Sequence, residues 1–315
     1  WALAATTTLL HLLVGWPGDG LGDWPFHPVS LGGKTYRAQE VLGPQSPLAD
    51  ATVTLLPGMS TYVGADITAG IWQCGLASSD DVSLFVDLGT NGEMVLGNKD
   101  QRFIASAPAG PALEGGKLTW GTGSVPGAIC GVRIERGRAK VRTIDHAVPV
   151  GICGTGILEA MAGLVREGLV DETGKLVEPY FHKGFPLAST LDYQRITLSQ
   201  QDIREIQMAK STIRAGIESL IERSGISRQR VHQVFLAGGF GYYLDPQKAA
   251  VIGLLPADLA ERTTAVGNTS LKGAIGLLTG AVTLEELQAI AAGAEEIVLG
   301  NDEAFQRLYI DYLNF

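Results

Sequence analysis

The chain has 315 residues, and 45% of them are hydrophobic, which is enough for one large domain or two lobes and excludes a disordered chain. Lysine and arginine total 24 against 33 acidic residues, giving a formal net charge of −9, and no block of like charges occurs. This charge pattern argues against a nucleic-acid partner. The 41 glycines are about 13% of the chain and indicate many tight turns or places where a ligand approaches the backbone.

The first residues and the cysteines indicate a cytoplasmic protein without a membrane segment. Residues 1–14 are apolar, but they lack the basic start of a signal peptide and fall short of the roughly 18 residues that a membrane span needs. Cys74, Cys130 and Cys153 have no paired spacing, so neither a disulfide framework nor a complete metal site is predicted. The chain starts with Trp1 inside a patterned segment, which predicts that it begins within a domain.

Hydrophobic periodicity predicts few elements in the first 80 residues. Thr6–Thr8, followed by leucines, is typical of a strand end that enters a short helix. A Gly/Pro-rich surface loop is predicted from Gly15 to Pro47. A helix is predicted from Tyr62 to Leu76, with Val63 and Ile67 on one face.

A strand-rich region is predicted next. Val82–Val86 is a continuous apolar run, as expected for a strand that is buried on both faces. Further strands, separated by turn residues, are predicted at Met94–Leu96, Phe103–Ile104, Ala128–Glu135 and Ala139–Ile144.

The second half alternates helices and strands. Ser199 and Asp202 resemble a capping box that opens a long helix, and Gly225 lies just past its end. Further helices are predicted over Ile157–Val165, Leu271–Leu278 and Asp302–Leu313, and another begins after Thr283, with Glu286 in its cap. A buried strand is predicted over Val231–Ala237. Hairpins followed by this alternation predict an α/β domain with a mixed sheet.

One turn has the composition of a phosphate-binding loop. A buried strand ends at Asp87, and the chain then runs through Gly89, Thr90, Asn91, Gly92 and Glu93 into another strand. Glycine lets phosphate oxygens approach backbone amides, while the Thr and Asn side chains add donors. Asp87 is placed to hold Mg²⁺ through water. No Walker lysine follows, and the alternative, an ordinary Asn-Gly hairpin, fits these residues equally well.

Two more glycine loops are candidates for nucleotide binding. The first, Gly151–Glu159, opens a helix whose amides at Gly154, Thr155 and Gly156 suit an anion or a sugar edge, and Glu159 can accept from ribose hydroxyls. The second follows the strand that ends at Ala237, and its bare backbone can lie against a purine. Its residues are Gly238, Gly239, Phe240 and Gly241. Either loop taken alone is more typical of a simple turn.

In this order the loops resemble the superfamily of acetate and sugar kinases, heat-shock chaperones and actin. Residues 87–93 are similar to its second phosphate hairpin, 151–159 and 234–241 to its adenosine-binding parts, and 266–274 to its second connecting helix. Asp66 lies where the first connecting helix belongs. The resemblance implies an actin-like, ribonuclease H-like two-lobe α/β fold with mixed sheets flanked by helices, which binds ATP and magnesium.

A closer resemblance is to the C-terminal domain of the reductive activators of corrinoid proteins. The matching segments are Leu55–Gly58 with Tyr62–Asp66, Asp87–Glu93, Ala109–Gly115, Gly151–Gly156 and Leu236–Gly241. The resemblance implies slow ATP hydrolysis and docking on a corrinoid protein of a methyltransferase system, whose Co(II) is reduced to Co(I). It also implies that the electron enters through an upstream iron–sulfur domain. Asp66 and Asp87 are the candidate catalytic carboxylates.

The resemblance also predicts how the lobes divide. Residues 1–80 are expected to be the remainder of a first lobe, incomplete at its N-terminus, with the first connecting helix. Residues 81–315 are expected to form the second lobe, with the phosphate hairpin, the adenosine loops and the second connecting helix. The first phosphate hairpin is expected upstream of Trp1, so the 315 residues alone are expected to bind ATP poorly. Ala4-Ala5 stands where the family tends to have Gly-Asn.

Three alternatives remain open at this point. The first is an ATP-dependent electron activator of the 2-hydroxyacyl-CoA dehydratase type, in which a cysteine such as Cys153 helps to bridge a shared cluster. The second is a small-molecule kinase with Asp66 as its base. The third is a nucleotide-sensing docking module without rapid turnover. A homodimer is also left open.

Overall fold

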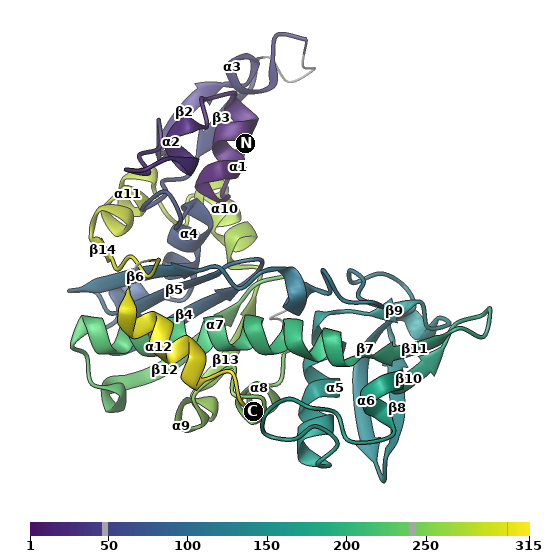
Figure 1. Ribbon diagram of the computed structural model, residues 1–315. Helices are drawn as coiled ribbons and strands as arrows, with labels where there is room; N and C mark the ends of the chain where they lie inside the picture. Colours follow the sequence, from purple (N-terminus) through teal and green to yellow (C-terminus); the bar gives the residue numbers. More distant parts are fainter. Residues whose placement is uncertain (46–49, 240–243, 301) are drawn as a thin grey trace.

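The computed structural model describes residues 1–45, 50–239, 244–300 and 302–315. These residues form an N-terminal lobe, a central six-stranded sheet and a β-rich unit at one end of that sheet (Figure 1). None of the helices in the described ranges has the length and apolar character needed to cross a bilayer. Cys74, Cys130 and Cys153 are all free thiols.

The N-terminal lobe contains a three-stranded sheet in the order β1-β3-β2. β1 (Ala2–Leu3) runs parallel to β3 (Thr52–Leu55), and β2 (Lys34–Arg37) runs antiparallel to it. Its helices are α1 (Thr7–Val14), α2 (Asp19–Gly22) and α3 (Ala38–Leu42).

The predicted loop from Gly15 to Pro47 is wrong over α2, β2 and α3, which lie within it, and Pro47 lies outside the described residues. In β2 only Tyr36 is partly buried. Pairing with β3, rather than an alternating pattern, makes this segment a strand.

The central sheet has the order β13-β12-β4-β5-β6-β14. Its strands are β4 (Val82–Leu88), β5 (Gly92–Gly97), β6 (Arg102–Ala107), β12 (Val231–Ala237), β13 (Thr263–Gly267) and β14 (Ala294–Glu296). The first three form an antiparallel meander, whereas β12 runs parallel to both β4 and β13, and β14 runs parallel to β6. The sheet is mixed, as the sequence predicts.

Each face of the central sheet has its own core, which confirms the prediction that β4 is buried on both sides. Leu84 and Val86 contribute to a core that includes α5 (Gly154–Arg166) and α7 (Gln200–Ser224). Phe85 and Val95 point the other way, into a core shared with α4 (Ala65–Gln73) and the N-terminal lobe. Each such side chain contributes roughly 1.5–3 kcal/mol when fully buried.

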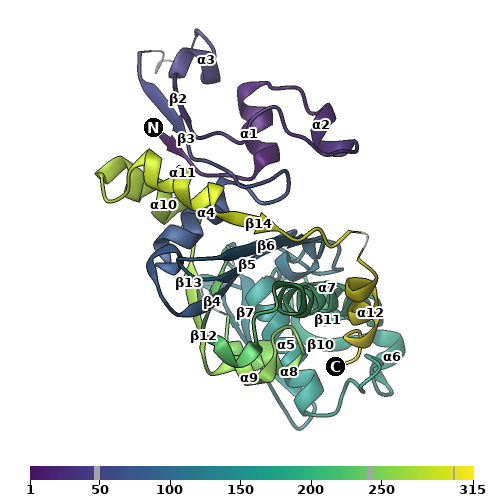
Figure 2. The ribbon, with the colours of Figure 1, turned by 90° about the vertical axis from the view of Figure 1, so that its left-hand side faces the viewer.

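Helices α4, α10 (Thr269–Thr279) and α11 (Leu284–Ala292) lie between the N-terminal sheet and the central sheet (Figure 2). The predicted helix over Tyr62–Leu76 is shorter at both ends. Before the helix starts, Val63 lies in a turn, in which its amide donates to the Ser60 hydroxyl and its carbonyl accepts from the Ser60 amide. After the helix ends, Gly75 adopts the left-handed conformation, with φ +67°.

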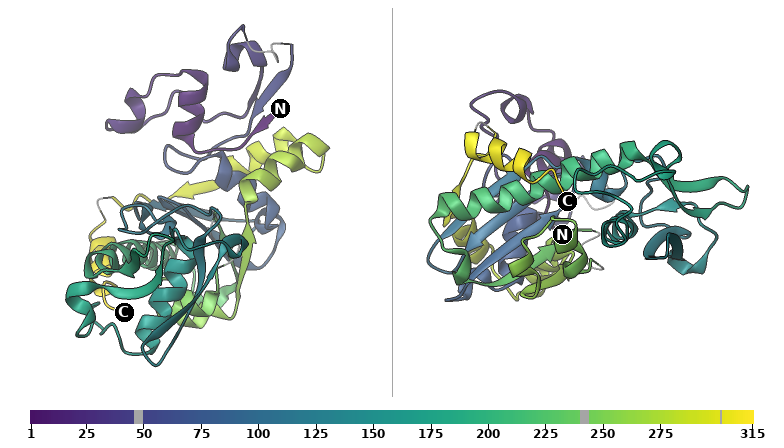
Figure 3. Two further views of the ribbon diagram at one scale, coloured as in Figure 1. Left: turned by 90° about the vertical axis from the view of Figure 1, so that its right-hand side faces the viewer. Right: turned by 60° about the horizontal axis from the view of Figure 1, so that its bottom comes forward.

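The β-rich unit lies at the N-terminal end of α7 (Figure 3). It is made of β7 (Ala128–Glu135), β8 (Arg138–Thr143), β9 (Gly151–Ile152), α5, α6 (Tyr180–Lys183), β10 (Phe185–Ser189) and β11 (Arg195–Leu198). The predicted capping box at the start of α7 is confirmed, since Ser199 and Asp202 each accept a hydrogen bond from the other's backbone amide. Gly225 ends the helix in the left-handed conformation.

The remaining short helices lie around the central sheet, except for η3, which follows β8 in the β-rich unit. They are η1 (Leu76–Ser78), η2 (Pro111–Glu114), η3 (Ile144–His146), η4 (Arg228–Arg230), α8 (Pro246–Val251), α9 (Ala257–Ala260) and α12 (Glu303–Asp311). α12 lies along α7, where the Ser211 hydroxyl donates to the Tyr309 carbonyl.

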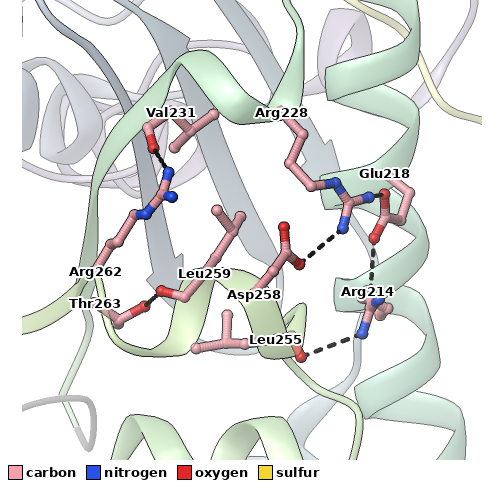
Figure 4. A network of polar contacts seen from close by, with 9 residues as sticks. All are labelled: Arg214, Glu218, Arg228, Val231, Leu255, Asp258, Leu259, Arg262 and Thr263. Carbon is pink, nitrogen blue, oxygen red and sulfur yellow. Dashed lines mark hydrogen bonds and ion pairs between the residues drawn. The ribbon is translucent and has the colours of Figure 1, made fainter.

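An ion-pair network joins α7 to the segments on either side of β12 (Figure 4). Glu218 on α7 is buried and pairs with Arg214, at 2.8 Å between Oε1 and Nε, and with Arg228 of η4. Arg228 also pairs with Asp258 of α9 at 3.2 Å, and Arg214 donates to the Leu255 carbonyl. The network fixes the segments that lead into β12 and β13, and both of these strands end at the candidate site.

Candidate functional site

Strand ends from the N-terminal sheet and the central sheet meet at one cavity of about 260 Å³. Its lining residues are Ala4, Ala5, Thr6, Leu9, Asp66, Asp87, Gly238, Gly239, Asn268 and Ser270. They follow the carboxyl ends of β1, β12 and β13, lie at the end of β4, or begin α4 and α10. In open α/β sheets, ligands bind outside the carboxyl ends of the strands.

The two sheets contribute to this cavity in the same way. Each has a parallel strand pair, β1 with β3 and β12 with β13. After one strand of each pair the chain supplies a loop, and after the other it supplies a helix that starts at the cavity. Asp66 and Ser270 are the second residues of these helices, α4 and α10. The arrangement brings two polar helix starts face to face.

A close contact between α4 and the central sheet brings Asp66 and Asp87 to the same cavity. Gly70 lies directly over Phe85, so a Cβ at Gly70 would come within 2.4 Å of the ring. Asp66 is one helical turn before Gly70, and Asp87 is two residues beyond Phe85 on the same face of β4. The missing side chain at Gly70 therefore allows the two carboxylates to converge.

Burial and mutual repulsion make this carboxylate cluster costly to ionise. Burial, followed by the neighbouring Asp66 and Glu114, raises the pKa of Asp87 to about 7. Glu93 lies opposite Asp87 in the hairpin, and burial with the Asp66 and Asp87 charges raises its pKa to about 8. Burial also raises the pKa of Asp66. A cation between these groups would relieve the repulsion.

The donor set fits a hard divalent cation that keeps its water shell. Carboxylate oxygen is the ligand that Mg²⁺ prefers, and Mg²⁺ usually binds through only one or two carboxylates. Across the described ranges, no three His, Cys, Asp or Glu side chains are placed to hold a metal ion without further ligands. That Asp87 holds Mg²⁺ through water stays a prediction.

The hairpin after β4 turns through three residues, with the Gly89 amide donating to the Asn91 carbonyl at 3.0 Å. Thr90 and Asn91 are exposed at the tip, and the Thr90 hydroxyl donates to Glu114 at 2.8 Å. Gly92 faces α7, where a Cβ would come within 2.1 Å of Ile213. Packing thus requires Gly92, whereas Gly89 is open.

The glycine loop after β12 borders the same cavity. Gly238 has φ +112° and packs on β4, so a Cβ there would lie 2.3 Å from the Leu88 carbonyl oxygen. Gly239 is exposed, and no atom of the described residues lies within 4 Å of the position that its Cβ would take. Phe240 and Gly241 lie outside the described residues.

The loop at the start of α5 does not reach the Asp87 cavity. Gly154, Thr155 and Gly156 are all buried, and a Cβ on Gly156 would lie 2.1 Å from the Ile129 carbonyl oxygen. Packing of α5 on β7 therefore accounts for Gly156.

Glu159, one turn further along α5, lines a separate cavity of about 730 Å³. Its carboxylate pairs with Lys248 of α8 at 2.7 Å and accepts from the Val132 amide at 3.2 Å. Basic side chains that include Arg133 and Arg142 line the same cavity.

Sequence reasoning did not identify several of these residues. Lys248 has no motif around it, and its role depends on α8 packing near α5. Glu114 appeared only within a segment that matches the family. Residues 4–6 appeared only in the family comparison and as a predicted strand end. Asn268 carries a local signal, because its side chain caps α10 by accepting from the Leu271 amide at 2.8 Å.

Two family models cover nearly the whole chain. The model described as the C-terminal domain of RACo, the ASKHA domain, matches residues 81–315, and the model of the RACo middle region matches residues 1–79. The chain belongs to the RACo family. This RACo-family chain has the actin-like α/β fold of the superfamily that its loops resemble, with mixed sheets flanked by helices.

Similar proteins carry names from corrinoid chemistry. The chain is 32% identical over 323 residues to a corrinoid activation enzyme, RamQ, of Eubacterium limosum, covering 96% of this chain and 54% of that protein. It is 28% identical over 306 residues to a [Co(II) methylated amine-specific corrinoid protein] reductase of Methanosarcina barkeri, covering 90% and 55%.

A solved structure of a reductive activator for corrinoid, iron-sulfur protein matches with a TM-score of 0.93 and 32% identity, over 100% of this chain and 52% of that one. The RACo-family chain thus spans about half the length of the relatives that it matches.

Proposed function

We propose that this chain is the ATP-binding part of a protein that drives the reduction of a corrinoid protein from Co(II) to Co(I). The observation that carries the proposal is the convergence of Asp66, Asp87 and the Gly238–Gly239 loop on one cavity at the ends of parallel strands. Family membership and the printed names of the relatives support the corrinoid partner. The partner belongs to a methyltransferase system.

The nucleotide spans the two cavities. Gly239 lines the smaller cavity, and Lys248 of α8 lines the larger one. The triphosphate occupies the smaller cavity, with the amides after Asp87 and Gly238 as donors. The nucleoside occupies the larger cavity, where Lys248 holds Glu159 as an acceptor for ribose hydroxyls.

Magnesium supplies charge neutralisation between the phosphates and the protein. Asp87 holds the ion through water, and Asp66 faces the same cavity from α4. Both carboxylates are costly to ionise when the site is empty, as the raised pKa values indicate. Binding of the cation with ATP lets them ionise without repulsion, so cation and nucleotide are expected to bind cooperatively.

ATP acts by biasing the shape of the protein rather than by phosphorylating a substrate. A two-lobed protein can use binding energy in this way only if one shape binds the ligand better. The joint between the lobes suits such a change: α10 meets α4 through Gly273 on Ala69 and Gly276 on Trp72, each closer than a Cβ would permit. The two glycines bring the helices into close contact, and this contact is the joint at which we place the change of shape.

The alternative of a cluster-bridging cysteine finds no support at Cys153. Its side chain is only 2% exposed, and its thiol donates to the Ile129 carbonyl at 3.3 Å. A cysteine that shares a cluster with another chain has to reach the surface. A kinase remains distinguishable by experiment, since it would transfer phosphate to a small acceptor.

The test uses the complete protein with its corrinoid partner. Titration with Mg²⁺–ATP should show binding, and the Co(II) absorption of the partner should give way to that of Co(I) only with ATP and a reductant. Asp87→Asn should abolish the ATP-dependent step, and Asp192→Asn, in an exposed turn, should not. Rapid phosphate transfer to a sugar or carboxylate without the partner would overturn the proposal.

A further inference from the structure

One hydrogen bond ties the phosphate hairpin to a distant segment. The hydroxyl of Thr90, at the hairpin tip, donates to Oε2 of Glu114 at 2.8 Å, across 24 residues of sequence. Glu114 is the last residue of η2 and is exposed to solvent. It does not line the cavity that contains Asp66 and Asp87, so nothing in the proposed nucleotide site so far accounts for it.

The position of Glu114 is fixed by its neighbours in η2. Ala112 and Leu113 are 3% and 1% exposed, and they anchor the short helix in the core. Gly110 and Gly115 flank it with φ +75° and +89°, conformations that favour glycine. The two turns leave η2 little freedom, so Glu114 is held toward the hairpin rather than swinging freely on the surface.

The Glu114 carboxylate acts electrostatically on the phosphate site. Its charge is among those that raise the pKa of Asp87, which places it within interaction range of the strand end. The Thr90 hydroxyl has a single proton to donate. A phosphate oxygen that binds at the hairpin tip needs the same proton, and its negative charge is repelled by the carboxylate that holds it.

We propose that Glu114 is a positioning residue that occupies Thr90 in the nucleotide-free protein and is displaced from it by the phosphates of ATP. The inference rests on the proposed function, and it adds a regulatory element to that site. Glu114 sets the affinity for anionic nucleotides by charge and by competition for one donor, and it holds the hairpin tip in place when the site is empty.

The test compares Glu114→Gln, Glu114→Ala and the control Glu261→Gln, an exposed carboxylate between α9 and β13, in the complete protein. Dissociation constants are measured by calorimetry for Mg²⁺–ATP and for adenosine, which has no phosphate. Glu114→Gln should bind Mg²⁺–ATP about three- to tenfold more tightly, because one negative charge near the phosphates is removed. Its adenosine affinity should equal that of the wild type, and Glu261→Gln should change neither ligand.

Two further measurements separate competition from other roles. The gain in Glu114→Gln should shrink at high salt, since screening weakens the repulsion that the substitution removes. Glu114→Ala, which also frees Thr90, should gain at least as much as Glu114→Gln. Unchanged or weaker ATP binding with intact adenosine binding would overturn the inference. A large fall in kcat at unchanged ATP affinity would overturn it too, and would make Glu114 a catalytic base instead. If neither ligand binds to any form, the proposed function itself has failed.

Discussion

Replacing Asp87 by asparagine should stabilise the nucleotide-free protein while it abolishes function. Burial and the carboxylates of Asp66 and Glu114 raise the pKa of Asp87 from an ordinary 3.8 to about 7. Because the folded-state pKa is raised, ionised Asp87 costs stability, and the cost appears as pH rises from about 4 to about 7. Each pKa unit corresponds to about 1.4 kcal/mol, so the cost approaches roughly 4 kcal/mol above pH 7.

Asparagine has nearly the same shape as protonated aspartate and no charge. The stability difference between Asp87→Asn and the wild type should therefore be small at pH 4, grow through pH 5 and 6, and level off above pH 7. Urea unfolding at each pH, without nucleotide or magnesium, measures it. Comparing the two proteins at each pH cancels the titration of groups that do not interact with Asp87. A difference that does not vary with pH would show that Asp87 ionises freely, and the repulsive cluster would then be wrong.

Other substitutions test the ion-pair network, the contact of α4 with the central sheet, and the glycine loop after β12. Glu218→Ala should destabilise the fold by about 1–3 kcal/mol in urea unfolding, because it removes the buried carboxylate that pairs with the partly buried Arg214 and Arg228, whereas Asp258→Asn, at an exposed carboxylate, should cost under about 1 kcal/mol. Gly70→Ala should cost about 1–3 kcal/mol, because its Cβ would meet the Phe85 ring at 2.4 Å; an unchanged unfolding midpoint would refute the close contact. Gly239→Val should leave that midpoint nearly unchanged but weaken ATP binding at least about tenfold by calorimetry, and equal affinity would remove this loop from the site.

Local signals in the sequence were sufficient for the elements that carry the core. The apolar run of β4 and the capping box of α7 depend on residues close in sequence, and both predictions were confirmed. The edge strand β14 gave no such signal. β14 is three residues long and lies beside β6 only because the chain returns there after about 190 residues. Its pairing is a property of the folded chain, and no periodicity in residues 294–296 indicates it.

The candidate site divides along the same line. Asp87 and Gly238 could be nominated from sequence, because each stands at the end of a buried strand. That Asp66 faces Asp87 could not be derived from spacing, since it depends on α4 lying over Phe85 at Gly70. The partner of Glu159 was likewise hidden, because Lys248 lies on a helix 89 residues further along.

The glycines of the three loops show why a nucleotide motif is ambiguous in sequence. Gly92, Gly156 and Gly238 each lie where a Cβ would come within 2.3 Å of a neighbouring atom, so packing alone requires them. Among the described residues, a Cβ at Gly89 would meet only the Asn91 carbonyl oxygen, at 3.7 Å, and one at Gly239 would meet no atom within 4 Å. Both kinds of glycine occur in the same short motifs, which therefore record packing and ligand approach together. Substitution by alanine should separate them: at the packed positions the free energy of unfolding falls, while at the open positions only the affinity for the nucleotide is free to change.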